Sequence, residues 1–152
     1  MKVINNENDF TIFVTNKEIG NKDNLKDDIK KLLIKLKQKY KLSMSGFYKA
    51  NVYLNKKLSI IDFVKEDDLD FFKDIIDLDV NVYEDAVIYL KFKDIFITNK
   101  FDNIYYYKNN YYINICDVSD KEFYKVIEHT LYVYGKQLEQ IKNKLNLVVK
   151  SI

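Results

Sequence analysis

The 152-residue sequence contains no proline, no tryptophan and no arginine, and it contains one cysteine, one histidine and three glycines. Because arginine is absent, the chain cannot make the bidentate guanidinium contacts that read guanine bases. The single Cys116 has no partner for a disulfide within the chain, and its apolar surroundings in the sequence predict a small buried side chain. The abundance of lysine, asparagine, isoleucine, tyrosine and phenylalanine is typical of an A·T-rich genome, so lysine content alone indicates no function.

The residues that most enzymes use for catalysis are scarce and scattered. His129 is the only imidazole, and no second histidine or cysteine lies at metal-ligand spacing from it, so we expect no metal site. The same histidine is the only candidate base for a nucleophile, and the glycines are too far apart for a phosphate-binding loop. Carboxylate pairs such as Asp67-Asp68 lie in charged runs, where solvated surface is the usual role, and they leave one route to acid/base catalysis open. We therefore expect a chain that is not an enzyme and uses no cofactor.

Two further absences concern the membrane. No stretch approaches the run of about 18 apolar residues that a membrane-spanning helix needs, and the N-terminus lacks the features of a signal peptide. The net charge is only +2, from 25 cationic and 23 anionic side chains, so the overall field favours neither nucleic acid nor an acidic membrane. We expect a cytoplasmic protein without membrane contact.

The first half has the pattern of a strand, a helix and two further strands. Phe10 to Thr15 is rich in β-branched and aromatic residues, and the stretches "FYKANVYL" and "LSIIDFV" predict two more strands. Between the first and second strands, apolar residues at helical spacing predict a helix with one buried stripe, formed by Leu25, Ile29, Leu32, Leu33, Leu36 and Tyr40. Lys17 to Lys65 holds thirteen lysines against five acidic residues, a net charge of +8. These features predict a basic first domain over residues 1–65.

The charge reverses immediately after this domain. Glu66 to Asp79 holds seven acidic residues and one lysine, a net charge of −6, with apolar residues interleaved. Such a break is typical of a domain boundary, and the apolar content favours an ordered segment over a flexible tether. We expect an acidic connector over residues 66–82 and a second domain over 83–152.

The second half mixes short strands and helices. "DAVIYLKF" predicts a strand, a short helix follows at about residues 93–101, and residues 104–115 predict a hairpin. "KEFYKVIEHTLYVYG" has one apolar helical face and a glycine, Gly135, suited to the left-handed position after a helix. A further short helix and a final strand, "LNLVV", complete the order β-(α)-β-β-α-(α)-β. The sequence therefore predicts an α/β (α+β) fold of two small mixed units, with antiparallel hairpins and helices on one face.

The hairpin stretch "IYYYKNNYYINI" contains five tyrosines. A two-residue turn at Asn109-Asn110 suits the positive φ angles that such turns need. This register places Tyr107 opposite Tyr112, and alternation puts the isoleucines on one face with two tyrosines. The two faces are Ile104, Tyr106, Tyr111, Ile113 and Ile115 on one side, and Tyr105, Tyr107, Tyr112 and Asn114 on the other.

The order of these segments resembles the bacterial MecA-type adaptor proteins. "MKVINNENDFTIFVT" is similar to that family's opening, and "YKLSMSGFYKANVYLNKKLSIIDFVK" to its two strands joined by a lysine-containing turn. In the second half, "IYYYKNNYYINI" resembles the family's tyrosine-rich hairpin, and "LYVYGKQ" resembles its E-Y-G-E segment with Val133 in place of a glutamate. The likeness extends over nearly the whole chain. It is a similarity in the pattern of residues, not a match to one diagnostic motif.

This resemblance implies an adaptor that brings a client protein to a ClpC-type AAA+ unfoldase, with the first domain recruiting the client and the second docking on the unfoldase. We expect contact residues at Tyr105, Tyr107, Tyr112 and Tyr132, because tyrosine offers a large contact area at low cost in rotamer entropy. Packing between helix and sheet is the alternative role for these rings. Two other functions stay open: a nucleic-acid-binding module that uses the basic first half with exposed tyrosines, and a phage or mobile-element inhibitor that binds a host protein.

Overall fold

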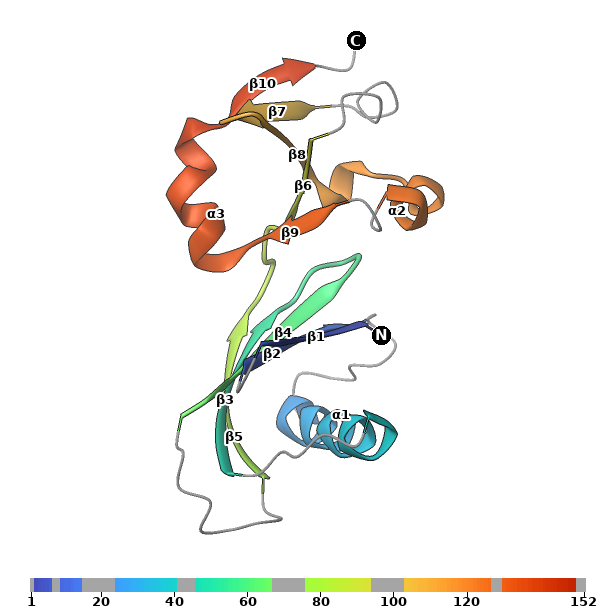
Figure 1. Cartoon of the computed structure of the whole chain (residues 1–152), viewed down its shortest axis with the longest axis vertical. Coiled ribbons are helices and arrows are strands. Elements are labelled where there is room, and N and C mark those ends of the chain that lie inside the picture. Colours follow the sequence, from blue (N-terminus) through green and yellow to red (C-terminus); the bar gives the residue numbers. More distant parts are fainter. Residues whose placement is uncertain are drawn as a thin grey trace. The chain divides into compact units, whose positions relative to one another are not determined.

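The computed structural model describes residues 2–6, 9–14, 24–40, 46–66, 76–93, 103–126 and 130–149. The chain divides into two compact units, Met1–Asp85 and Ala86–Ile152. Each unit contains one five-stranded sheet and at least one helix of its own (Figure 1), which confirms the predicted mixed α/β class with two units. The helix expected at about 93–101 and the lone His129 lie outside the described residues.

The first unit is built on a sheet with the strand order β1-β2-β4-β3-β5. Neighbouring strands are antiparallel except β3 and β5, which are parallel. The strands are β1 Lys2–Asn6, β2 Asp9–Val14, β3 Gly46–Tyr53, β4 Ser59–Lys65 and β5 Ile76–Tyr83. Strand β1 extends the sheet beyond the predicted set, in which the first strand was Phe10 to Thr15.

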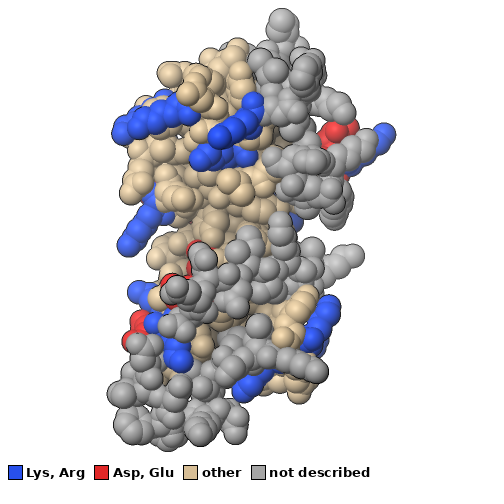
Figure 2. All heavy atoms as spheres, in the orientation of Figure 1, with Lys and Arg blue, Asp and Glu red and all other residues tan. Residues whose placement is uncertain are grey.

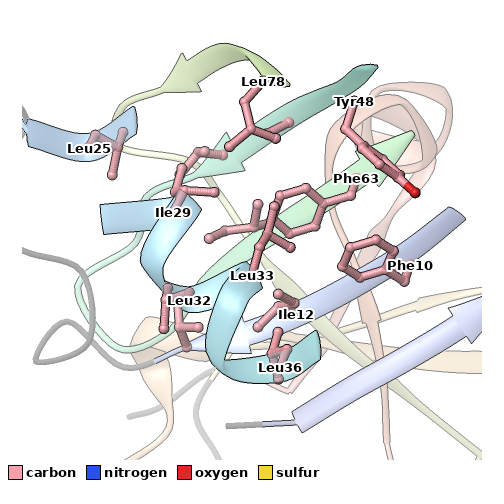
Figure 3. Packing of buried hydrophobic residues seen from close by; sticks show 14 residues of the cluster. Phe10, Ile12, Leu25, Ile29, Leu32, Leu33, Leu36, Tyr48, Phe63 and Leu78 are labelled. Carbon is pink, nitrogen blue, oxygen red and sulfur yellow. The ribbon is translucent and has the colours of Figure 1, made fainter. Parts of the chain in front are cut away.

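Helix α1, Leu25–Tyr40, covers one face of this sheet. The predicted stripe is confirmed for its first five members, all of which are buried, whereas Tyr40 at the last helical position is exposed. Asp27 and Asp28 lie in the first turn and lysines in the last, so the side-chain charges complement the helix dipole. The stripe packs against alternate residues of the strands (Figure 3), among them Phe10, Ile12, Tyr48, Phe63 and Leu78.

Strand β5 corrects the predicted connector. Its eight residues pair with β3 along their whole length, from Gly46 opposite Ile76 to Tyr53 opposite Tyr83, so residues 76–83 belong to the first unit. The backbone N–H of Leu54 also donates to the carbonyl oxygen of Tyr83 at 3.0 Å. The unit boundary therefore falls after Asp85 instead of at residue 65, and residues 67–75 of the expected connector lie outside the described residues.

The second unit is an antiparallel sheet with the strand order β10-β7-β8-β6-β9. The strands are β6 Tyr89–Phe92, β7 Ile104–Tyr107, β8 Asn110–Asn114, β9 Leu131–Val133 and β10 Asn146–Val149. Helix α2, Asp120–Val126, and helix α3, Gly135–Ile141, lie on opposite faces of the sheet (Figure 1). The sequence predicted helices on one face of each sheet. This agrees with the single described helix of the first unit, α1, and is wrong for the second unit, where the two helices lie on opposite faces.

Three local features differ from the sequence prediction. The helix expected to run to Gly135 is described only to Val126, and Leu131–Val133 is instead strand β9, paired with β6. Gly135 does take a left-handed φ of 58°, at the junction between β9 and α3. Cys116, predicted to be buried, is exposed, because the chain leaves the strand and enters the short 3-10 turn Ile115–Asp117, called η3.

The predicted last helix and final strand are confirmed as α3, followed by the 3-10 turn η5, Lys142–Lys144, and β10.

The tyrosine-rich hairpin has the predicted faces but a different turn. The positive φ angles are at Lys108 (46°) and Asn109 (63°), and Tyr106 lies opposite Tyr111, so the turn is one residue earlier than expected. Side-chain contacts favour this register: the Tyr106 and Tyr111 rings are 5.3 Å apart, and the Tyr106 hydroxyl donates to Asn109 Oδ1 at 2.9 Å. The shift preserves which residues share a face, and Ile104, Ile113 and Ile115 are all buried.

Candidate partner-binding surfaces

The face of the second sheet beneath α3 is lined by tyrosines. Tyr105 lies opposite Tyr112 across the hairpin, and Tyr112 packs with Val133 of β9 and Leu138 of α3 in a buried cluster. The Tyr89 and Tyr105 rings meet edge to face with their centroids 6.1 Å apart. Other half-buried residues surround this cluster, namely Tyr89, Tyr105, Tyr107, Ile141 and Leu145. The rings thus fill the space between the sheet and a short helix.

Burial of these rings favours their neutral form. Burial raises the pKa of Tyr112 above its ordinary value, with a further contribution from the neighbouring Tyr107. Burial likewise raises the pKa of Tyr89, helped by Tyr105 and Asp117 and opposed by a hydrogen bond with Asn114. A phenol whose ionisation is disfavoured in this way is suited to packing and neutral hydrogen bonding, not to proton transfer near neutral pH.

The structure brings together three of the four predicted contact residues. Tyr105, Tyr107 and Tyr112 share the face covered by α3, whereas Tyr132 pairs with Leu90 and lies on the opposite face. Tyr112 is only 4% exposed, so packing between helix and sheet accounts for it and little of its surface is left for a partner. Burial also raises the pKa of Tyr132. A binding role for the half-buried Tyr105, Tyr107 and Tyr132 stays a prediction.

A surface that the sequence reasoning missed lies next to Tyr105, at the edge of the sheet. Leu147 of β10 is opposite Tyr105 and 47% exposed, and the following Val148 is 54% exposed. Strand β10 ends the sheet within the described residues, with a bulge between Leu147 and Val149. We call Leu147 and Val148, with the adjacent Tyr105, Ile141 and Leu145, the β10 surface. The signal for it was the run "LNLVV", which has apolar residues on both sides of a strand instead of an alternating pattern.

Lysines flank the β10 surface. Lys142 and Lys144 are exposed in η5, which leads directly into β10, and neither forms an ion pair within the described part of the chain. Lys108 of the β7–β8 turn places its ammonium 5.3 Å from the centre of the Tyr107 ring. In Figure 2 lysines of the second unit are visible both on the side of α3 and on the side of α2, and the acidic residues visible in that unit lie on the side of α2. The β10 surface is therefore apolar with a basic flank.

The first unit has its own apolar edge at β5. This strand ends the described sheet, and its Val82 and Tyr83 are exposed, Tyr83 by 49%. The Tyr83 ring stacks on Tyr53 with a centroid distance of 4.9 Å and an interplanar angle of 9°. The pKa of Tyr53 is raised by burial and, to a smaller extent, by the neighbouring Asp62 and Tyr83. We call the exposed edge of β5, with its side chains Val82 and Tyr83, the β5 surface.

The solvent-facing side of α1 is basic. Lys26 and Lys30 lie 3.9 Å and 3.8 Å from Asp77 Oδ1, at the start of β5. Lys31 and Lys35 are exposed and form no ion pair with any other described residue, and Ile34 between them is exposed as well. The only aromatic residue on the helix is Tyr40, whose ring centre is 5.4 Å from the Lys39 ammonium.

Within the described ranges, no group of three or more histidine, cysteine, aspartate or glutamate side chains is placed to hold a metal ion. None of the helices described is both long and apolar enough to cross a membrane. No protein-family model matches the chain, and no curated protein or solved structure matches it significantly.

Proposed function

We propose that this chain is a non-enzymatic cytoplasmic adaptor, similar to the MecA type, that brings a client protein to a ClpC-type AAA+ unfoldase. One observation carries the proposal: each of the two separately packed units ends its described sheet in a strand with exposed apolar side chains. These are the β5 surface of the first unit and the β10 surface of the second. Exposed apolar edge strands are a liability in a monomer, and a binding role explains why they are kept.

The mechanism needs surfaces and no covalent chemistry. An edge strand offers its backbone N–H and C=O groups to an extended segment of another protein, and neighbouring side chains select which segment binds. In this proposal the β5 surface takes the client and the β10 surface takes the unfoldase. Because one chain carries both, engaging the first partner raises the effective concentration of the second, by an amount that depends on the reach between the surfaces.

The adaptor proposal is tested by the ATPase rate of a ClpC-type unfoldase with the full chain added. We expect stimulation that is lost in Leu147→Lys and retained in Leu131→Lys. The control is matched, because Leu131 is also an exposed leucine, at 67%, on the edge strand β9 at the other end of the same sheet. Tyr83→Lys is expected to keep the stimulation and lose the client. Absence of both binding and stimulation at about 10 µM chain would remove the proposal, and a lowered ATPase rate would favour the inhibitor function.

Nucleic-acid binding is the second candidate, favoured by the exposed Lys31 and Lys35 on α1. Single-stranded nucleic acid is usually held in a groove that combines cations with aromatic rings. In the first unit the exposed Phe47 and Tyr83 alternate with Tyr48 and Val52 of the α1-facing side, so they lie on the other face of the sheet. The exposed lysines of α1 and these two rings are thus separated by the sheet, which favours protein binding. Binding that collapses between about 0.1 M and about 0.5 M salt would instead indicate phosphate contacts.

A further inference from the structure

We propose that the β10 surface binds an extended segment of a partner protein in which apolar residues alternate with aspartate or glutamate. This inference deepens the proposed function and rests on it, because it names the chemistry of the segment that docks on the second unit. Three features of the structure support it: the position of β10, the apolar residues beside it and the lysines at its start.

The position of β10 favours a partner in extended conformation. Within the described sheet β10 pairs with β7 alone, so one side of its backbone faces away from the sheet. A strand that adds there gains backbone hydrogen bonds without any requirement on its sequence. The bulge between Leu147 and Val149 limits the regular ladder to a few residues. Side-chain contacts must therefore supply much of the affinity.

The apolar residues of the β10 surface favour a partner segment in which every second residue is apolar. Leu147 lies on the α3 side of the sheet, opposite Tyr105, and Ile141 and Leu145 are half-buried on that same side. An added strand places alternate side chains on this side, where they extend the partly covered apolar cluster. Val148, the adjacent residue in the strand, offers a further exposed apolar group.

The lysines at the start of β10 favour acidic residues at the other positions of the partner segment. Lys142 and Lys144 immediately precede β10, and the register that pairs Asn146 with Tyr106 brings Lys108 to the same end of the strand. The described acidic residue nearest to this segment along the chain is Glu139 of α3, so every charged side chain in residues 142–149 is a lysine. Opposite charges across a binding site contribute to specificity and to the rate of association.

A second copy of this chain is the rival occupant, because β5 also alternates apolar residues with Asp77 and Asp79. However, the Asp77 carboxylate already lies within 4 Å of the ammonium groups of both Lys26 and Lys30. A carboxylate compensated in this way gains less from further lysines. The charges therefore favour a separate acidic partner over self-association through β5.

The test uses the full chain and two fluorescein-labelled peptides of about eight residues, long enough for one strand. One peptide alternates valine with aspartate and the other alternates valine with lysine. We expect the acidic peptide to bind with Kd of about 10 to 100 µM and the basic peptide at least about tenfold more weakly, as read by fluorescence anisotropy. The double variant Lys142→Glu/Lys144→Glu should weaken binding of the acidic peptide by about tenfold.

Matched controls place the effect on β10. Lys121→Glu/Lys136→Glu changes two exposed lysines elsewhere in the same unit and should leave the affinity within about twofold of the unmodified chain. Leu147→Lys should lose binding of the acidic peptide, and Leu131→Lys on β9 should retain it. Equal binding of both peptides, or equal loss in the control variants, would overturn the inference.

Two parallel measurements separate the possible failures. If the acidic peptide does not bind while the chain still stimulates the ClpC-type unfoldase, the inference fails and the adaptor function stands. If both fail, the adaptor function falls too. Sedimentation that finds dimers or longer assemblies, abolished both by Lys142→Glu/Lys144→Glu and by Tyr83→Lys, would overturn the inference by showing that a second copy occupies the edge.

Discussion

The first unit packs one long helix against a single face of its sheet, whereas the second packs two short helices against opposite faces of its own. Helix α1 has sixteen residues and five buried aliphatic side chains, and α3 has seven residues and one, Leu138. The difference explains the use of tyrosine. A short helix brings few side chains to the interface, so wide rings from the sheet, such as Tyr105 and Tyr112, fill the remaining space.

The comparison also bears on binding. In the first unit the long helix covers the central strands of the sheet and contacts β5 through Leu78 and Asp77. In the second unit α3 packs over Tyr112 and Val133, while Leu147 and Val148 at the β10 edge are about half exposed. Less complete coverage leaves the β10 surface free to gain from a partner. Under the proposed function, the second unit is therefore the one in which packing and binding would share residues.

The largest effect is expected from removing a core residue of α1. Leu33 is fully buried at the centre of the stripe, so Leu33→Ala should lower the free energy of unfolding by about 3 to 5 kcal/mol. Hydrogen exchange read by mass spectrometry should show faster exchange in residues 1–85 and unchanged exchange in 86–152, because each unit has its own core. Equal acceleration in both units would contradict the division.

A smaller effect is expected for the corresponding residue of α3. Leu138→Ala should cost about 2 to 3 kcal/mol, since the half-buried rings around it can move into the space that the side chain leaves. The same exchange measurement should locate this loss in residues 86–152. A cost as large as that of Leu33→Ala would show that the tyrosine cluster is as tightly packed as the core beneath α1.

Alkaline pH should destabilise the second unit through its buried tyrosines. Folding raises the pKa of Tyr89, Tyr112 and Tyr132 in the second unit and that of Tyr53 in the first. The unfolded chain releases these protons near the ordinary tyrosine pKa of 10.0, so their contribution to stability is complete below that pH and is lost as pH rises through the higher folded values. Hydrogen exchange in residues 86–152 should therefore accelerate above about pH 10. Unchanged exchange in these residues above that pH would contradict this prediction.

The smallest effect concerns the link between α1 and β5. Lys26→Gln should lower the free energy of unfolding by less than about 1 kcal/mol, because its ion pair with Asp77 is exposed and Lys30 remains beside the same carboxylate. Chemical denaturation at low and high salt measures the change, and the difference between variant and unmodified chain should shrink as salt rises. A larger, salt-independent loss would mean that the lysine stem contributes by packing.

Sequence patterns predicted the elements whose local and tertiary preferences agree. The four-and-three spacing of α1 fixed its buried face, and the alternation in the hairpin fixed which tyrosines face α3. The turn itself was misplaced by one residue, because asparagine tolerates positive φ better than lysine does. The ring contact between Tyr106 and Tyr111 and the hydrogen bond to Asn109 compensate for the less favourable Lys108.

Of the three strands that the sequence patterns did not predict, β1, β5 and β9, the last two were hidden by another signal. Strand β5, with the sequence "IDLDVNVY", alternates apolar and polar residues over its whole length, but its charge led to the connector prediction. Strand β9 continues the helical pattern of the preceding segment, and only its pairing with β6 makes it a strand. The β10 surface depends on strand order, which places β10 at the edge of the sheet. No local pattern encodes strand order.

The central claim is that this chain acts by binding proteins through its sheet edges, and the most direct test is identification by mass spectrometry of what co-purifies with the tagged full chain from its native cells. Parallel purifications at about 0.1 M and about 0.5 M salt separate apolar from phosphate-driven binding. The account predicts a AAA+ unfoldase at both salt concentrations, retained with Leu131→Lys and lost with Leu147→Lys. Recovery of nucleic acid at low salt only, with no unfoldase at either concentration, would contradict it.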